Sequence, residues 1–395
     1  MNQYTSGLSP RVTMGKKRKL TVGLVFDDSL DRPDGVQQYV QRVAEWLSAQ
    51  GHEVHFLVGE TIRTDLKNVH SLSHNLRVRF NGNTMSMPLP TSKKVLKKVL
   101  ADHDFDILHI QMPYSPFMAG RLMKIASKKT AIIGTFHILP YSKLVIFANR
   151  LLAWANWRSG KLLDAVTAVS PPAQEFARKL YGYDCTIVPN PVRVSDFTSK
   201  AKPKKNDIPR IVFLGRLVER KGARHLLEAV AYIHDHHLHD APFEVVIGGK
   251  GELFEQLQHF VRDAGLKGVV SFPGFIPEVE KAALLSTADI AVFPSVSGES
   301  FGISLLEAMV ASPGVVLAGN NPGYASVMHG LHDRLVNPLD TPAFAHMLSD
   351  WLADGVMRTT AAAEQQRYVQ QYDIAIVGAQ IESVYQKALS TKHRK

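Results

Sequence analysis

Two carboxylates on either side of a glycine-containing loop are the clearest sign of chemistry in the sequence. Glu299 and Glu307 enclose the run Ser-Phe-Gly-Ile-Ser-Leu-Leu, in which the glycine opens a helix. The backbone N–H groups of Phe301, Gly302 and Ile303 can bind sugar hydroxyls or phosphate at the start of that helix. Glu299 can accept hydrogen bonds from sugar hydroxyls, and Glu307 from a ribose diol. The helix dipole alone would explain the acids, but not the exposed Phe-Gly pair that we expect between them.

A second group of residues offers positive charge. The pair Gly215-Arg216 comes directly after the apolar run at residues 210–214, and Lys221 follows five residues after Arg216, at the start of the next expected helix. A planar guanidinium and a mobile ammonium could together neutralise a diphosphate, which gains charge as its bond to a sugar breaks. If this stretch stood alone, two surface cations beside a loop would be the better explanation.

Glycines mark two further turns from strand to helix. Gly35 lies where the first expected loop enters its helix, so backbone N–H groups and the positive helix end are available to an anion there. Gly249 belongs to the sequence Gly-Gly-Lys-Gly at residues 248–251, which closes the strand expected at 244–247. Each glycine by itself is also explained by an ordinary turn. Their positions at strand ends make both of them candidates for binding the same ligand.

One of the 17 histidines stands where a side chain can reach a ligand between two sheets. His137 follows the strand expected at residues 131–135 and could donate a hydrogen bond to a sugar or acceptor oxygen. Most of the other histidines must lie on the surface or be satisfied within the core. The position of His137, rather than its residue type, makes it a candidate.

A helix expected at residues 92–100 carries a basic face. Its two faces on a helical wheel are Lys93, Lys94, Lys97 and Lys98 on one side, and Val95, Leu96, Val99 and Leu100 on the other. At about 1 kcal/mol for each lysine near an anionic membrane, four lysines would hold the helix there reversibly. An ordinary solvated helix that packs its aliphatic side on the domain explains the pattern equally well.

Short apolar runs that alternate with helical periodicity position these candidates. Such alternation predicts parallel strands joined by helices. The strands of the first series are expected at residues 20–26, 53–58, 107–110, 131–135, 165–169 and 186–188, and those of the second at 210–214, 244–247, 269–272 and 290–293. We therefore predict an α/β fold of two Rossmann-like, doubly wound domains that face each other across a cleft. Open parallel sheets bind ligands beyond the carboxyl ends of their strands, which is where the candidates cluster.

The chain length of 395 residues predicts about two domains. We place a basic tail at residues 1–18, the first domain at 19–194, a polar linker at 195–209, the second domain at 210–376, and a C-terminal helix with a basic tail at 377–395. The linker assignment rests on its polarity and its lack of a periodic apolar pattern. Both tails are expected to be solvated and disordered.

The composition excludes several classes of protein. With 45% apolar and 21% charged residues the chain is typical of globular proteins rather than fibrous or disordered ones. The single cysteine, Cys185, cannot form an intramolecular disulfide, and we find neither a signal peptide nor a membrane-spanning segment, so we expect a cytoplasmic protein. The net charge of +10 favours an anionic partner. Nucleic acid is not expected, because the basic residues are dispersed rather than interleaved with aromatic ones along one groove.

Taken in order, these motifs resemble those of the family 4 retaining glycosyltransferases, which have the GT-B fold. The resemblance covers about residues 20–390 and rests on the motifs at residues 35–37, 136–137, 188–191, 215–222, 248–251 and 299–307. Within that family, residues 93–98, 104–110 and 135–137 are most similar to bacterial phosphatidylinositol mannosyltransferases.

The resemblance implies a reaction and its partners. It implies transfer of a hexose, mannose from GDP-mannose, to a membrane lipid acceptor such as phosphatidylinositol. The anomeric configuration would be retained, and no metal or other cofactor would be required. The lysine helix would meet an anionic phospholipid surface, which would place the enzyme peripherally on the inner face of the cell membrane. The C-terminal helix would cross back to the first domain.

The resemblance also implies a role for each candidate. Gly35 and Gly249 would approach the donor, and Arg216 and Lys221 would bind its diphosphate. The start of the helix would present the N–H groups of Phe301, Gly302 and Ile303. Glu299 would bind the sugar hydroxyls, Glu307 would bind the ribose, and His137 would contact the reacting sugar. Of these, His137, Arg216, Lys221 and Glu299 would be catalytic.

Several positions depart from the family pattern and leave the donor open. Asp34 stands where the family usually has a glycine, Ser312 and Pro313 change the run after Glu307, and Arg334 replaces a common glycine. One alternative is a transferase that uses a UDP-sugar on diacylglycerol or a soluble acceptor. An epimerase or hydrolase with the same fold would leave the lysine helix without a purpose. A non-catalytic anion- or membrane-binding module is a further alternative, which the joint presence of the acidic and basic candidates argues against.

Overall fold

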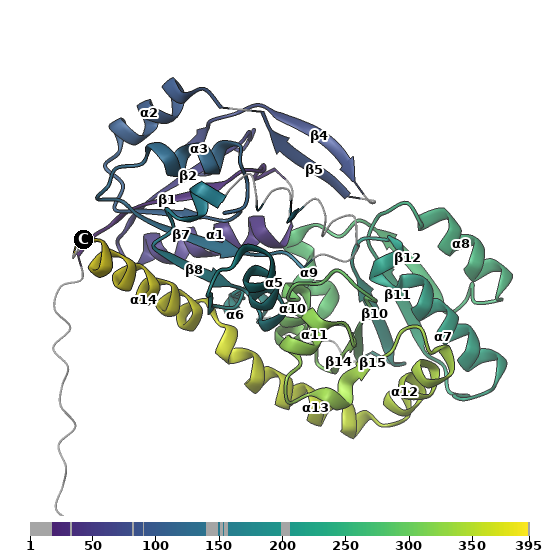
Figure 1. Ribbon diagram of the computed structural model, residues 1–395. Helices are drawn as coiled ribbons and strands as arrows, with labels where there is room; N and C mark the ends of the chain where they lie inside the picture. Colours follow the sequence, from purple (N-terminus) through teal and green to yellow (C-terminus); the bar gives the residue numbers. More distant parts are fainter. Residues whose placement is uncertain are drawn as a thin grey trace, which may run out of the picture.

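The computed structural model of the chain describes residues 18–31, 34–80, 83–89, 91–139, 149–150, 153, 157–198 and 206–393. These residues form two lobes, each built around a parallel sheet with helices on its faces (Figure 1). The α/β architecture of two Rossmann-like units predicted from the sequence is confirmed. Residues 1–17 of the basic tail placed at 1–18 lie outside the described part.

The N-terminal lobe is built on a seven-stranded sheet in the order β3-β2-β1-β6-β7-β8-β9, with each neighbouring pair parallel. Its strands are β1 (Thr21–Phe26), β2 (Glu53–Val58), β3 (Val69–Ser71), β6 (Ile107–Ile110), β7 (Ala131–Phe136), β8 (Ala165–Ala168) and β9 (Thr186–Ile187). Its helices include α1 (Gly35–Ala49), α2 (Lys93–Asp102), α3 (Met118–Ile125) and α5 (Pro171–Tyr181). The antiparallel hairpin of β4 (Asn75–Phe80) and β5 (Asn83–Pro88) extends from this lobe toward the other one (Figure 1).

The C-terminal lobe is built on a six-stranded parallel sheet in the order β12-β11-β10-β13-β14-β15. Its strands are β10 (Arg210–Leu214), β11 (Glu244–Gly248), β12 (Val270–Gly274), β13 (Ile290–Phe293), β14 (Val315–Gly319) and β15 (Leu335–Val336). Its helices include α7 (Ala223–Asp235), α8 (Phe254–Asp263), α9 (Glu278–Leu285), α10 (Ile303–Ala311), α11 (Pro322–Val327), α12 (Thr341–Ala353) and α13 (Gly355–Tyr368).

Both sheets reverse their strand order beside the first strand of the lobe. In the N-terminal lobe β1 lies between β2 and β6, and in the C-terminal lobe β10 lies between β11 and β13. Helices that leave neighbouring strands on opposite faces open a crevice at such a point, beyond the carboxyl ends of the strands. The loops after β1, β6, β10 and β13 therefore form the expected ligand-binding region.

Two crossings of the chain between the lobes lie side by side. The backbone N–H of Val192 donates to the carbonyl of Tyr372 at 2.9 Å, and the N–H of Ile374 donates back to the carbonyl of Val192 at 2.9 Å. The following helix, α14 (Ile374–His393), runs along the N-terminal lobe (Figure 1). Its Gly378 lies so close to Trp46 of α1 that a Cβ there would be 2.4 Å from the indole ring.

A buried ion pair joins the lobes directly. The guanidinium of Arg42 on α1 donates to Oε1 of Glu307 on α10 at 2.9 Å and to the carbonyl of Pro191 at 3.0 Å. The two side chains are only 9% and 1% exposed. Lys281 of α9 lies 3.4 Å from the other carboxylate oxygen of Glu307. Because a charge stranded in a dry interior is costly, this group constrains how far α1 can move from α10.

Some sequence-based expectations differ from the structure. Val95, placed on the aliphatic side of the lysine helix, is 42% exposed and so does not pack on the domain; its position on the wheel borders the lysines. Residues 195–197, placed in a polar linker, belong to helix α6 (Val194–Phe197), and Phe197 is buried because it packs in the core between the lobes. Lys392, expected in a solvated tail, lies in α14 and pairs with Asp164 at 2.8 Å.

We predict that Arg42→Met destabilises the protein by about 3 kcal/mol or more, because it leaves Glu307 buried with a single, longer cationic contact. Denaturant unfolding followed by tryptophan fluorescence measures this change. The matched control is Arg193→Met, which removes a more exposed ion pair with Glu45, a residue of α1 like Arg42. This change should lower the free energy of unfolding by less than about 1 kcal/mol. Equal effects of the two substitutions would contradict a structural role for the buried pair.

Candidate active site

The loops after β10 and β11 are in direct contact and form one wall of the crevice. The N–H of Gly215 donates to the carbonyl of Gly248 at 3.0 Å, and the N–H of Leu217 donates to that of Lys250 at 2.9 Å. Gly249 has a φ of 147°, and a Cβ on it would lie 1.8 Å from the carbonyl oxygen of Gly215. Only glycine fits there. Its first role is therefore to let the loop that carries Arg216 pack against its neighbour.

A cluster of charges forms where the loops after β10 and β13 meet the start of α10. Oε1 of Glu299 accepts from Arg220 at 2.6 Å, lies 2.8 Å from Nζ of Lys221, and lies 2.8 Å from the hydroxyl of Ser295. The structure thus brings Glu299 and Lys221 together. It also adds Arg220 and Ser295, which the sequence analysis did not single out.

Burial and charge compete at Glu299, and charge prevails. Burial by itself would raise the pKa of this carboxyl group, but the positive charges of Lys221 and Arg220 and the hydrogen bonds to its oxygen lower the pKa to about 2. Burial in turn lowers the pKa of Lys221, against the opposing effect of Glu299. Glu299 is therefore ionised at neutral pH and serves to hold two cations in fixed positions.

All three contacts of Glu299 described above reach the same oxygen atom, Oε1. A carboxylate has about four acceptor positions on its two oxygens. Oε2 is therefore the atom of Glu299 that remains suited to a ligand hydroxyl group.

The positive charge of Arg216 acts on Asp34 of the N-terminal lobe and on Lys221 of the C-terminal lobe, so Arg216 lies within electrostatic reach of both residues. Oδ1 of Asp34 accepts from the N–H groups of Val36 and Gln37 at 2.9 and 2.8 Å, so Asp34 is the N-cap of α1. The first-turn N–H groups next to Gly35, which we expected to meet an anion, are thus already occupied.

The start of α10 differs from that of α1 because no side chain caps it. Gly302 precedes the helix with a φ of 149°, and a Cβ there would lie 2.8 Å from the ring of Tyr324. Phe301 is only 5% exposed and packs edge-on against Tyr372, which contradicts our expectation of an exposed Phe-Gly pair. Of these two helices, α10 rather than α1 thus offers N–H groups without a side-chain cap to an anion.

His137 lies at the end of β7, almost buried between Gln111 and the edge of the Tyr39 ring. Burial and the neighbouring His109 lower the pKa of His137 to about 3, so its ring is neutral at pH 7. Its Nε2 lies 2.9 Å from Oε1 of Gln111, and the amide nitrogen of Gln111 donates to the carbonyl of His109 at 3.3 Å. In this arrangement Nε2 carries the proton and Nδ1 is an acceptor, whereas we had expected His137 to donate to the ligand.

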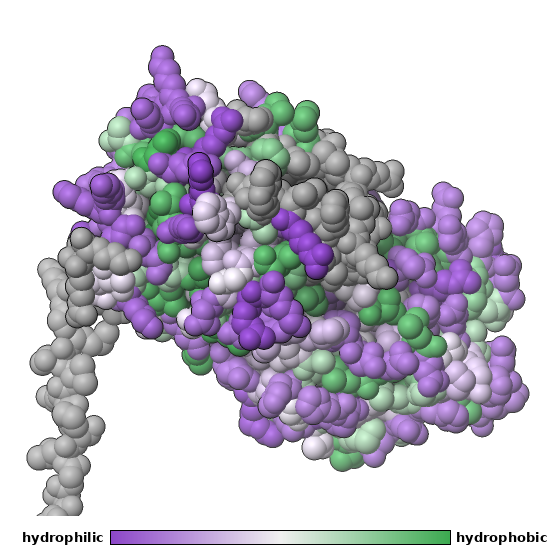
Figure 2. All heavy atoms as spheres, in the orientation of Figure 1, coloured by the Kyte–Doolittle hydropathy of each residue, from purple (hydrophilic) through white to green (hydrophobic). Residues whose placement is uncertain are grey.

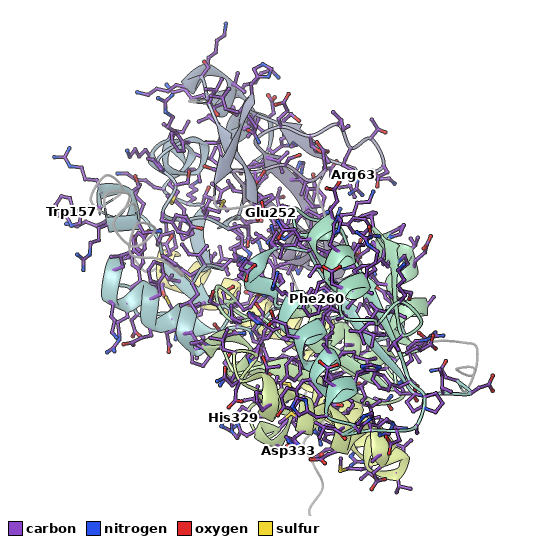
Figure 3. The ribbon with its side chains drawn as sticks, turned by 90° about the vertical axis from the view of Figure 1, so that its right-hand side faces the viewer. Arg63, Trp157, Glu252, Phe260, His329 and Asp333 are labelled. Atoms are coloured by element: carbon purple, nitrogen blue, oxygen red, sulfur yellow. The ribbon has the colours of Figure 1, made fainter. Side chains whose placement is uncertain are left out.

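A cavity of about 540 Å³ opens between α1, α6 and α9. It is lined from both lobes, by Leu30, Gln38, Arg42 and Arg63 on one side and by Glu278 and Val279 on the other. Figure 3 shows Arg63 on the N-terminal lobe, while Glu252, just after the glycine loop, lies where the lobes meet. The volume of this cavity is in the range of small-molecule binding sites.

The residues missed by the sequence analysis have partners that are distant in the chain. Arg42 and Glu307 are 265 residues apart, and nothing in the spacing along α1 points to that contact. Arg220 could have been found, because it stands directly beside Lys221 in a loop already thought to bind an anion.

Comparison with protein families gives two matches that together span both lobes. The family described as Glycosyltransferase Family 4 matches residues 33–196, and the family described as Glycosyl transferases group 1 matches residues 194–371.

Curated relatives match nearly the whole chain. A phosphatidyl-myo-inositol mannosyltransferase of Mycolicibacterium smegmatis is 31% identical over 380 residues, which cover 93% of this chain and 94% of the relative. A GDP-mannose-dependent alpha-(1-6)-phosphatidylinositol monomannoside mannosyltransferase of the same organism is 25% identical over 348 residues, covering 84% and 89% of the two chains.

Solved structures share the arrangement of both lobes. The sucrose-phosphate synthase of Thermosynechococcus elongatus has a TM-score of 0.72 at 18% identity, covering 94% of this chain and all 100% of the other. The Anabaena HepE protein in complex with UDP has a TM-score of 0.69 at 16% identity, covering 92% and 99%. The chain therefore belongs to the family 4 glycosyltransferases, has their GT-B fold, and is a glycosyltransferase.

Proposed function

We propose that this enzyme transfers mannose from GDP-mannose to phosphatidylinositol or a closely related lipid. The observation that carries the proposal is that relatives named phosphatidyl-myo-inositol mannosyltransferase align with 93% of the chain, and so with both lobes. The solved structures with bound UDP are under 25% identical, so they support the fold and do not choose the base of the donor.

The donor diphosphate would lie between Arg216, Lys221 and the uncapped start of α10. Two cations and a helix N-terminus are suited to a leaving group that gains negative charge. Glu299 keeps Lys221 in place before the donor arrives, so little rearrangement is needed during the reaction. Loss of Arg216 or Lys221 should accordingly lower turnover more than it lowers stability.

The sugar would lie between Glu299 and His137. Oε2 of Glu299 would accept from a sugar hydroxyl, and Nδ1 of the neutral His137 would accept from another. The reaction would break the bond between the anomeric carbon and the phosphate oxygen and form a bond from that carbon to the acceptor oxygen. Attack on the face that the nucleotide leaves would retain configuration, and the departing phosphate oxygen would take the acceptor's proton. We propose no metal in this step.

Glu307 remains our candidate for binding the donor ribose, but in this structure its carboxylate already has partners. Its oxygens bind Arg42 and Lys281, and its side chain is 1% exposed. Ribose binding at Glu307 would therefore compete with the ion pair that joins the lobes. We propose that donor binding is coupled in this way to a change in the position of α1 relative to α10.

The lipid acceptor would reach the enzyme through α2 and the cavity between the lobes. Lys93, Lys94, Lys97 and Lys98 are all exposed, and Val95 lies exposed among them. Helix α2 forms the end of the N-terminal lobe that is farthest from the C-terminal lobe, and its surface is hydrophilic (Figures 1 and 2). A basic helix with one exposed apolar residue suits peripheral docking on anionic lipid, here on the inner face of the cell membrane. Within the described residues, no helix is long and apolar enough to cross a bilayer.

Calorimetric titration with GDP-mannose and with UDP-glucose, each with and without phosphatidylinositol vesicles, tests the proposed function. We expect a heat of binding from GDP-mannose and none from UDP-glucose. The heat from GDP-mannose should be larger, or its binding tighter, when the vesicles are present. Mannose transfer to the lipid is then measured on extracted vesicles. Selective binding of UDP-glucose would overturn the proposed donor, and transfer to a soluble acceptor only would overturn the proposed lipid.

We predict that Asp34→Gly tightens donor binding by about five- to tenfold, because a carboxylate beside a diphosphate is worth about 1 kcal/mol or more of repulsion. The substitution also frees the N–H groups of Val36 and Gln37. Replacing an N-cap aspartate by glycine should change stability by only a few tenths of a kcal/mol. The matched control is Asp340→Gly, which removes the corresponding cap of α12. Weaker donor binding by Asp34→Gly would show that Asp34 helps to build the site.

We predict that replacing Lys93, Lys94 and Lys97 by glutamine weakens binding to phosphatidylinositol vesicles by about 100-fold, at about 1 kcal/mol for each lysine. Lys98 is left in place because it pairs with Asp102 at 2.7 Å. The control carries the exposed substitutions Arg262→Gln, Lys267→Gln and Arg367→Gln on the C-terminal lobe. Vesicle sedimentation measures both variants, and an equal loss in the control would show that only net charge matters.

A further inference from the structure

Three histidines gather on the N-terminal lobe, away from the crevice. His55 comes from β2, His70 from β3, and His103 directly follows α2. One ring nitrogen from each can be chosen so that all three lie within 4.8 Å of one another. Nδ1 of His55 and Nε2 of His70 are 3.0 Å apart. His55 is the third residue of its strand and thus lies toward the amino ends of the strands, whereas the crevice lies beyond their carboxyl ends.

Glu53 orients the buried member of this cluster. Its Oε1 lies 3.2 Å from Nε2 of His55, so that nitrogen donates to the carboxylate and Nδ1 turns its lone pair toward His70. A carboxylate that holds the outer nitrogen of a histidine in this way is a recurring feature of metal-binding histidines, and it fixes both the tautomer and the ring orientation. Phe105 closes one side, with its ring edge-on to His55 at 5.4 Å between centroids.

We propose that His55, His70 and His103 bind one zinc ion, with solvent as its fourth ligand. Three neutral imidazoles suit tetrahedral Zn²⁺, whose bonds to nitrogen are about 2.0–2.1 Å long. Those bond lengths put two ligand nitrogens about 3.3 Å apart, close to the separation between His55 and His70. His103 is only half buried and directly follows the end of a helix.

The protonation states of the cluster agree with this assignment, which stands on the geometry. Burial lowers the pKa of His55, and burial together with the other histidines lowers the pKa of His70 to about 4. The rings of His55 and His70 are therefore neutral near pH 7 and need not lose a proton to bind a metal.

The ion would join three separate elements of the lobe. It would tie the edge strands β2 and β3 to the carboxyl end of α2, the helix that carries the exposed lysines. Zinc would thus fix the orientation of α2 on the sheet without contacting the donor or the reacting atoms. Its presence or absence does not depend on which sugar the enzyme transfers.

The test uses the full-length protein without an affinity tag, stripped by a chelator and dialysed. Titration with Co²⁺ should give the visible absorption bands of a tetrahedral nitrogen-ligated site, saturating at one equivalent, and Zn²⁺ should abolish them. Calorimetry then gives the affinity for Zn²⁺ itself. Binding to the folded state should also raise the melting temperature in proportion to the logarithm of the free zinc concentration.

Variants of the half-buried ligands decide between this site and adventitious binding. His70→Ala and His103→Ala should each weaken zinc binding by tenfold or more, and Glu53→Gln should weaken it by about 10- to 100-fold while leaving all three histidines in place. The matched control is His329→Ala, at an exposed histidine near the far end of the C-terminal lobe, which should change nothing (Figure 3). Circular dichroism of each variant checks that it is folded.

Two results would overturn the proposal. One is the absence of stoichiometric Co²⁺ or Zn²⁺ uptake by the folded protein, which would mean that the rings are joined by hydrogen bonds alone. The other is uptake that His70→Ala and His103→Ala leave unchanged, which would place the metal at another surface histidine.

Discussion

The buried contact between Arg42 and Glu307 is the constraint on which the geometry of the crevice depends. Each residue sits on a helix that faces the other lobe, and the two side chains are only 9% and 1% exposed. A pair of this kind contributes little net stability when it is intact, but it strongly disfavours arrangements that separate its members. It therefore sets the distance between α1 and α10, and with it the distance between the two walls of the site. The two chain crossings, which are hydrogen-bonded to each other at Val192 and Tyr372, hold the lobes together next to this ion pair.

Within the crevice, one carboxylate organises the positive charge. Glu299 binds Arg220 and Lys221 through a single oxygen and stays ionised because their charges outweigh the cost of its burial. The glycine at position 249 lets the neighbouring loop approach closely enough to support Arg216. A pocket of fixed cations suits a reaction whose main requirement is to stabilise a phosphate leaving group. Asp34 is the exception, since it places negative charge and an N-cap where the family usually has glycine.

The two ends of the first sheet have separate roles in this account. The carboxyl ends of its strands carry His137 and Gln111 and face the C-terminal lobe. The amino-end side carries His55, and β3 and α2 bring His70 and His103 to it. If α2 docks on the membrane surface and the histidines bind zinc, membrane docking and metal binding occur on one side of the lobe, and sugar transfer to the lipid acceptor occurs on another. The shared sheet is the rigid connection between them.

The amino-acid sequence by itself determined the strands of both parallel sheets except β3, β14 and β15, together with the two-lobed α/β class and the family. Buried parallel strands are continuous apolar runs, which is why β2, β6, β10 and β13 begin and end at the predicted residues. Short motifs at strand ends led us to expect Arg216, Lys221, Glu299 and His137 near one crevice, because parallel strands all end at the same edge. The structure brings Lys221 and Glu299 of this set into contact. The β4–β5 hairpin and helices α12 and α13 carried no motif and were not predicted.

Only the tertiary structure decided how these side chains are partnered. Arg220 joins Glu299, Asp34 occupies the N–H groups beside Gly35, and Phe301 is buried rather than exposed. Glu307 binds an arginine that is 265 residues away, and the three histidines come from separate elements. Such contacts depend on which faces of distant elements pack together. Local periodicity and spacing carry no record of that packing, since they report the environment of a residue and not the identity of its neighbour.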